Sequence, residues 1–117
     1  MAIRRLASGA QGRSRAVIHD GCVFTVATAP DSSEGMAGQT AQTLAALDRN
    51  LADAGTDKTR ILSATVYVTD IKQKDEMDAV WCEWIGSADN WPQRACVQTG
   101  LAGNTLVEIT IVAALPK

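Results

Sequence analysis

Residues 16–26 read Ala-Val-Ile-His-Asp-Gly-Cys-Val-Phe-Thr-Val, two β-forming runs that flank the Asp20-Gly21 dipeptide. Because glycine tolerates the positive φ of a two-residue turn, this stretch predicts a β-hairpin. A short run at 3–6 predicts one more strand at the edge. His19 is the only histidine of the chain. Its place beside the turn favours a solvated turn residue over a general base.

Beyond the hairpin the spacing of apolar residues changes to that of a helix. After a polar loop at 30–35, Leu44, Leu47 and Leu51 recur at helical spacing, and Gly55 stands where a helix-ending glycine is expected. Residues 61–69 then alternate as a half-buried strand does.

A second helix is predicted after this strand, capped by Asp70 or Asp75. Its apolar stripe comprises Met77, Val80, Trp81, Trp84 and Ile85. Two strands, at 94–99 and 106–115, close the chain. The resulting order is β-β-β-α-β-α-β-β, which predicts an α+β fold with two helices packed on one face of a mixed sheet.

The composition indicates one domain over residues 1–117, since it is even and contains no linker or repeat. Only 4% of the residues are aromatic, so the core must consist mainly of small aliphatic side chains. We therefore expect further apolar burial against other subunits.

Several classes of partner and cofactor are disfavoured. A formal net charge of -2 offers no footprint for a nucleic-acid backbone. The absence of a long apolar run and of a signal-peptide pattern predicts no membrane partner and a cytoplasmic protein. Three cysteines without C-x-x-C spacing and a single histidine argue against a metal site. No nucleotide-binding motif is present, and we expect no cofactor.

The most informative segment reads Trp-Pro-Gln-Arg-Ala-Cys-Val at 91–97, followed by Leu-Val-Glu-Ile-Thr-Ile at 106–111. Strand alternation puts Arg94 and Cys96 on one face, and Glu108 opposite to its apolar neighbours. If the two strands are adjacent, an arginine, a thiol and a carboxylate share one face. Arg94 would then grip a planar carboxylate while Glu108 activates a water. The alternative is an Arg94–Glu108 cross-strand ion pair without a ligand.

These segments resemble the Rid family of reactive intermediate deaminases, also called YjgF proteins. The resemblance extends over nearly the whole chain, through the hairpin, the first helix with Gly55, and the strand at 61–69. Its most specific part is Pro92-x-Arg94-x-Cys96-Val97 with the downstream Val107-Glu108-Ile109. It implies a chorismate-mutase-like fold that assembles as a homotrimer, with clefts between adjacent subunits.

The resemblance also implies an activity, the hydrolysis of 2-imino acids, reached from enamines such as 2-aminoacrylate, to 2-oxo acids and ammonia. By motif match, Arg94 would bind the substrate carboxylate, Cys96 would line the pocket and Glu108 would position the attacking water. An imine carbon is already electrophilic, so orientation and proton transfer suffice without a cofactor.

The chain departs from the family pattern at two places. Val26-Ala27 stand where many deaminating members carry Ser-Gly, and Arg13-Ser14 stand near the position of a family tyrosine. We therefore expect Arg13 and Val26 to face the pocket.

Three alternatives to the deaminase remain open. The first is a non-catalytic protein that binds or senses a small carboxylate such as a 2-oxo acid. The second is an endoribonuclease, which the net charge disfavours. The third is a nucleophilic Cys96 thiol, which lacks a histidine partner in the pattern.

Overall fold

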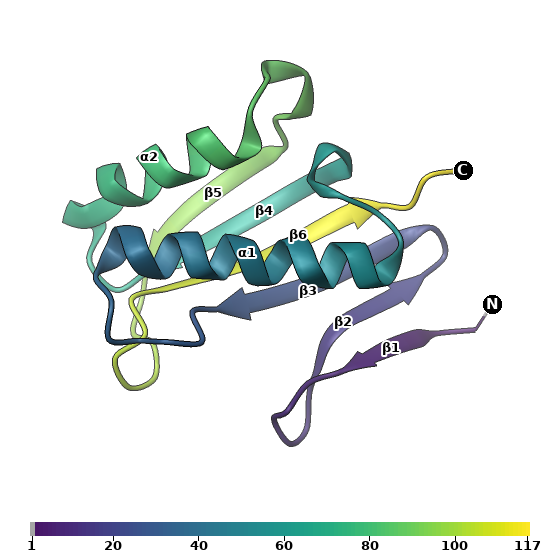
Figure 1. Ribbon diagram of the computed structural model, residues 1–117, viewed down its shortest axis with the longest axis horizontal. Helices are drawn as coiled ribbons and strands as arrows, with labels where there is room; N and C mark the ends of the chain where they lie inside the picture. The colour runs from purple at the N-terminus through teal and green to yellow at the C-terminus, as the bar shows by residue number, and fades with distance from the viewer. Residues whose placement is uncertain (1) are drawn as a thin grey trace.

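The computed structural model describes residues 2–117 and consists of one sheet and two long helices (Figure 1). Three single-turn 3₁₀ helices, at Lys58–Arg60, Ile71–Gln73 and Ala88–Asn90, connect the longer elements. The elements are β1 (Arg4–Ala7), β2 (Ser14–His19), β3 (Cys22–Thr28), α1 (Met36–Ala54), β4 (Ile61–Val68), α2 (Lys74–Ile85), β5 (Gln93–Gln98) and β6 (Val107–Ala114). This order confirms the predicted β-β-β-α-β-α-β-β arrangement.

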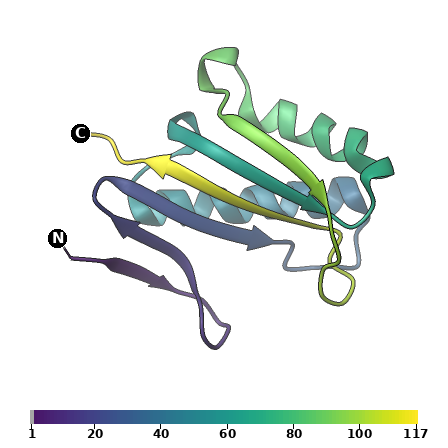
Figure 2. The same cartoon turned by 180° about the vertical axis from the view of Figure 1, so that it is seen from behind.

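The sheet has the strand order β1-β2-β3-β6-β4-β5. Only the β4–β5 pair is parallel, so the sheet is mixed, as predicted. Both helices cover the same face of the sheet, and from behind the opposite face is bare (Figure 2). We call these the helix face and the open face.

The predicted adjacency of the last two strands is wrong, because β4 lies between β5 and β6. The helix α2 connects β4 to β5, and a crossover of this kind returns the chain as a parallel strand. The other side of β4 is occupied by β6. Every second residue of β6 is buried, whereas no residue of β5 is fully buried. Burial therefore favours β6 in the centre of the sheet and β5 at its edge.

The turn and the helix end adopt the backbone conformations that the sequence predicts. Asp20 and Gly21 have φ of 51° and 79°, as a type I′ hairpin turn requires, and His19 beside them is exposed. Gly55 has φ of 98°, and its N–H donates to the carbonyl of Ala52 at the end of α1.

The start of α2 differs from the prediction. Asp70 accepts a hydrogen bond from the backbone N–H of Lys72 and so caps the short Ile71–Gln73 turn rather than α2. The helix itself begins at Lys74 without a side-chain cap, and Asp75 lies within its first turn. The 3₁₀ turn runs directly into the helix, which leaves no extended residue for a cap at this point.

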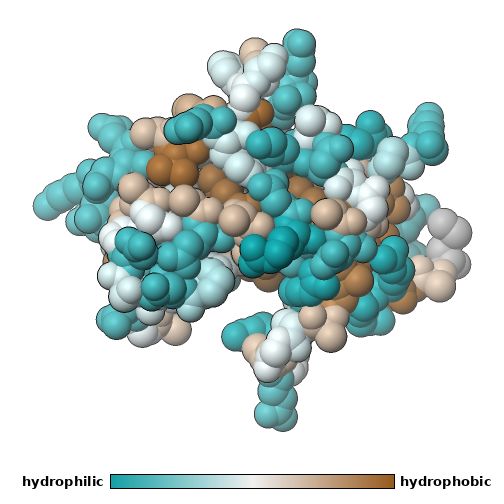
Figure 3. All heavy atoms as spheres, viewed as in Figure 1, coloured by the Kyte–Doolittle hydropathy of each residue, from teal (hydrophilic) through white to brown (hydrophobic). Residues whose placement is uncertain are grey.

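The core lies between the sheet and the two helices. Leucines of α1 meet the helix-face residues of β6, and Met77, Trp81 and Ile85 of α2 are buried, which confirms the predicted stripe. The outer surface of the helices is mainly hydrophilic, with apolar side chains visible between them (Figure 3). Trp91 differs from the buried Trp81, since it remains 63% exposed. None of the helices in residues 2–117 has the length and hydropathy of a membrane span.

Candidate functional site

Arg94 of β5 lies on the helix face, because its strand partner is the buried Ala64 of β4. Its Nη2 donates to Oδ1 of Asp78 at 2.5 Å, and the side chain is only 18% exposed. Its Nη1 meets the sulfur of Met77 at 3.7 Å, and the guanidinium lies 5.2 Å from the ring centroid of Trp81. A thioether is a weak acceptor, so Nη1 retains most of its capacity to donate. Three residues of α2 thus hold the guanidinium in place.

Asp78 joins two cations, since its Oδ2 also accepts a hydrogen bond from Nζ of Lys74 at 2.6 Å. Burial raises the pKa of Asp78, but the hydrogen bonds and charges of Lys74 and Arg94 lower it further, and the net pKa lies below the ordinary value. The carboxylate is therefore ionised at neutral pH. Two cations around one anion leave this cluster with a net positive charge, which suits an anionic ligand.

Cys96 lies on the same face as Arg94, as the alternation predicts, and packs against the edge of the core. Burial raises the pKa of its thiol; the charges of Arg94 and Lys74 oppose this and that of Asp78 adds to it. The raised thiol pKa keeps Cys96 protonated at neutral pH. A nucleophilic thiolate is disfavoured by this environment.

A cavity of about 310 Å³ adjoins the Arg94 guanidinium. Its lining comes from α2 and from the segment leading into β5: Asp78, Trp81, Cys82, Ile85, Trp91, Pro92 and Arg94. The sequence pattern alone does not assign Asp78 to the site. Its signal was the opposite charge of Lys74 at i,i+4 on the helix.

Glu108 belongs to a different cavity. In β6 it pairs with Thr28 of β3 and Tyr67 of β4, and it is half-buried on the open face. It lines a cavity of about 420 Å³ together with Arg13 and Val26, two other residues that the sequence predicted to face the pocket.

The structure thus separates the predicted site residues into two groups. Arg94 and Cys96 lie on the helix face of β5, whereas Glu108 lies on the open face of β6, with β4 between the two strands. The expectation that all three share one face of one chain is wrong. The alternative Arg94–Glu108 ion pair is wrong too, because the ion-pair partner of Arg94 is Asp78.

The wall of the Glu108 cavity is held by Gln39, a fully buried polar residue of α1 that sequence analysis missed. Its Oε1 accepts from the backbone N–H of Leu106 at 2.8 Å, and its Nε2 donates to the carbonyl of Asn104 at 3.0 Å. These bonds fasten the loop at 99–106, which supplies Ala102 and Thr105 to the cavity. Gln39 therefore positions the backbone that leads into Glu108.

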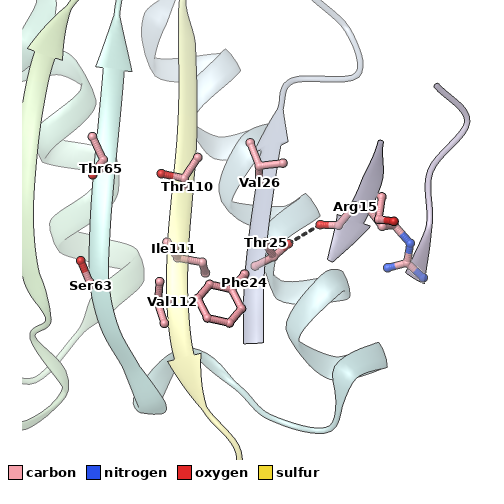
Figure 4. Close-up of a pocket in the computed structure, with 10 residues that line it drawn as sticks. Arg15, Phe24, Thr25, Val26, Ser63, Thr65, Thr110, Ile111 and Val112 are labelled. Carbon is pink, nitrogen blue, oxygen red and sulfur yellow. Dashed lines mark hydrogen bonds between the residues drawn. The ribbon is translucent and has the colours of Figure 1, made fainter. Parts of the chain in front are cut away.

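A third hollow of about 310 Å³ lies on the open face, across β3, β6 and β4 (Figure 4). Phe24, Val26, Thr65, Thr110 and Val112 project into this region, so its surface combines apolar groups with hydroxyls. At its margin the Thr25 hydroxyl donates to the carbonyl of Arg15 at 2.6 Å. Within residues 2–117, no three His, Cys, Asp or Glu side chains lie close enough to hold a metal ion.

The Asp78 cluster predicts a pH-dependent contribution to stability. A lowered folded-state pKa stabilises the fold above the unfolded value of about 3.9, and this stabilisation is lost as pH falls through the folded pKa. We expect Asp78→Asn to lower the unfolding free energy at about pH 6, and the gap to wild type to shrink towards about pH 3. Urea unfolding at one fixed protein concentration measures the unfolding free energies of wild type and variant at each pH.

The matched control is Glu83→Gln, which removes an exposed carboxylate from the same helix. Its difference from wild type should not close in this way. A gap for Asp78→Asn that is constant between about pH 6 and pH 3 would contradict the assignment.

Comparison with known proteins identifies the family of this chain. The sequence model of the family described as "Endoribonuclease L-PSP" matches residues 5–115. A RutC family protein of Haemophilus ducreyi is 39% identical over 104 residues, which are 87% of this chain and 88% of that protein. The RutC family protein YoaB of Escherichia coli strain K12 is 35% identical over 103 residues, which are 87% of this chain and 90% of that protein.

A solved structure agrees with these matches. The crystal structure of a YjgF-family member from Neisseria meningitidis superimposes with a TM-score of 0.93 at 37% identity, and covers 100% of this chain and 98% of that one. The sheet order and the two helices are therefore those of YjgF proteins. The chain belongs to the family whose model is described as Endoribonuclease L-PSP, the YjgF or Rid family.

Proposed function

We propose that this protein hydrolyses reactive 2-imino acids to 2-oxo acids and ammonia, with the substrate carboxylate bound by Arg94. The observation that carries the proposal is the Arg94 guanidinium. It is mostly buried, fixed by Asp78 and Trp81, borders a cavity, and its Nη1 meets only a sulfur. A buried guanidinium with unused donors is suited to a planar carboxylate, which accepts two of its N–H groups.

The reacting water requires a second group, for which we propose Glu108. It is a half-buried carboxylate in a cavity that also contains Arg13. Because Arg94 and Glu108 lie on opposite faces of one sheet, we propose that a complete site joins Arg94 of one subunit to Glu108 of its neighbour. This arrangement agrees with the clefts between adjacent subunits that the family resemblance implies.

A homotrimer, the assembly we propose, would cover the open face. This face carries two exposed apolar side chains, Phe24 of β3, 48% exposed, and Val97 of the edge strand β5, 41% exposed. β5 is also an edge strand, whose outward backbone N–H and C=O groups have no strand partner within residues 2–117. Both features favour association with further copies of the chain.

The chemistry needs only orientation and proton transfer. Arg94 holds the carboxylate, and Glu108 accepts a proton from water as the oxygen adds to the carbon of the protonated imine and the C=N π electrons move to nitrogen. Glu108 then passes this proton to the nitrogen of the carbinolamine. The C–N bond breaks and releases ammonia, and the hydroxyl loses its proton to Glu108, and from there to solvent, as the C=O bond forms. A positioned acid/base group accelerates such steps by roughly 10²–10⁴-fold. Cys96 lies two residues further along the same face of β5 and is not among the residues that line the Arg94 cavity, so its predicted place in the pocket wall is left to the edge backbone of its strand.

The activity test is 2-oxo acid release from freshly generated 2-iminopropanoate. Wild type should exceed the buffer rate, and Arg94→Ala should lower kcat/KM by about 10²-fold, since it removes a charge-assisted contact pair. Glu108→Gln should lower kcat by about 10²-fold and change KM little, because it removes a proton acceptor and leaves the carboxylate contact.

Lys72→Ala, which removes an exposed cation of the Ile71–Gln73 turn outside the cavities described above, is the matched control and should equal wild type. No acceleration by wild type, or full activity in Arg94→Ala, would refute the deaminase. Arg94-dependent binding of pyruvate without turnover would instead select the carboxylate-binding alternative, which the apolar Val26 at the Glu108 cavity favours.

The oligomeric state is a separate prediction. Sedimentation should give a mass near three times 12.4 kDa. Phe24→Asp places a charge on the open face and should dissociate the trimer, whereas Ile3→Asp, at a position that is 49% exposed before β1, should leave the mass unchanged. A wild-type mass of one chain would exclude a shared site.

A further inference from the structure

The cavity beside Arg94 has the size of a small-molecule site. At about 310 Å³ it lies at the lower limit of ligand pockets, which span about 300–1,000 Å³. It is about twice as large as the roughly 150 Å³ apolar cavity that accepts benzene. A six-membered ring therefore fits beside the guanidinium with room for a short linker.

The cavity has one charged part and a larger apolar part. Its two charged residues, Arg94 and Asp78, bond to each other, so the charge is concentrated in one place. The rest of the lining is apolar or aromatic: Trp81, Cys82, Ile85, Trp91 and Pro92. A ligand whose carboxylate contacts Arg94 must therefore place the remainder of its skeleton against these side chains.

Trp91 is the outer wall of this cavity. Its side chain is exposed, but Nε1 donates to the carbonyl of Gly86 at 2.9 Å and its backbone N–H donates to Ala88 at 3.2 Å. Pro92 follows directly and restricts the backbone. An indole that is fixed while one face stays in water provides a ready surface for an apolar or aromatic group.

We infer that the Arg94 cavity selects 2-imino acids with an aromatic or long aliphatic side chain over 2-iminopropanoate. The inference rests on the proposed deaminase function and names its substrate class. The carboxylate contacts Arg94, and the side chain lies between Trp91 and the Trp81–Ile85 surface of α2. An acidic side chain finds no cationic partner in this apolar part of the lining, which disfavours it in the same space.

The test compares two substrates made in situ, 2-imino-3-phenylpropanoate and 2-iminopropanoate. For wild type we expect kcat/KM to be about 10-fold or more higher for the phenyl substrate, as for added apolar groups in a fitted pocket. Trp91→Ala should reduce this ratio about 10-fold, because the phenyl substrate loses more kcat/KM than 2-iminopropanoate does. Ile71→Ala, an exposed apolar residue outside the cavity, is the matched control and should keep the wild-type ratio.

Turnover of 2-iminopropanoate without preference for the phenyl substrate overturns this inference and leaves the deaminase intact. Turnover of neither substrate overturns the deaminase. Calorimetry with 3-phenyl-2-oxopropanoate and pyruvate then tests whether the Arg94 cavity binds an aromatic side chain in preference to a methyl group. Tighter binding of the phenyl compound, lost in Trp91→Ala, supports the cavity assignment. Equal binding of the two compounds, or no binding, overturns the cavity assignment. A Trp91→Ala variant with an unchanged kcat/KM ratio and a lower sedimentation mass also overturns it, because a neighbouring subunit then fills the cavity.

Discussion

The insertion of β6 between β3 and β4 is the constraint on which the rest of the structure depends. Its residues Val107, Ile109, Ile111 and Ala113 are all buried under the helices, so the strand needs hydrogen-bonded neighbours on both sides. This placement directs Glu108 to the open face and leaves β5 at the edge. Arg94 and Glu108, which are near each other in sequence, thereby lie on opposite faces of one sheet.

The second determining interaction is the contact of Arg94 with α2. A guanidinium in a mostly buried position needs acceptors, and Asp78 supplies one while Trp81 provides a favourable aromatic surface. Because Asp78 also binds Lys74, the cluster keeps a positive charge and a fixed geometry. In the proposed function, such preorganisation lets a carboxylate bind without first ordering the arginine.

Most local structure was predictable from the sequence, because it is determined by neighbours along the chain. The Asp20-Gly21 hairpin, the leucine spacing of α1 and the alternation in β4 and β6 all form as the patterns predict. The faces of Arg94 and Glu108 along their own strands were also correct. Strand order was not predictable in this way, since the β4–β5 pairing depends on a crossover through α2. The Arg94–Asp78 contact joins residues 16 positions apart, and Gln39 bonds a loop 67 positions away. The i,i+4 spacing of Lys74 and Asp78 indicates a paired carboxylate on the helix, but no local pattern indicates that Asp78 contacts Arg94 or that Gln39 contacts the loop.

In the proposed function, a working site takes Arg94 from one subunit and Glu108 from another. Subunit complementation tests it directly: Arg94→Ala and Glu108→Ala chains are dissociated, mixed in equal amounts and reassembled, and imine hydrolysis is then measured. Each variant alone should be inactive, and random mixing should restore about one quarter of wild-type activity, because a cleft works only where each neighbour supplies its intact residue. A mixture as inactive as the separate variants would contradict the shared site.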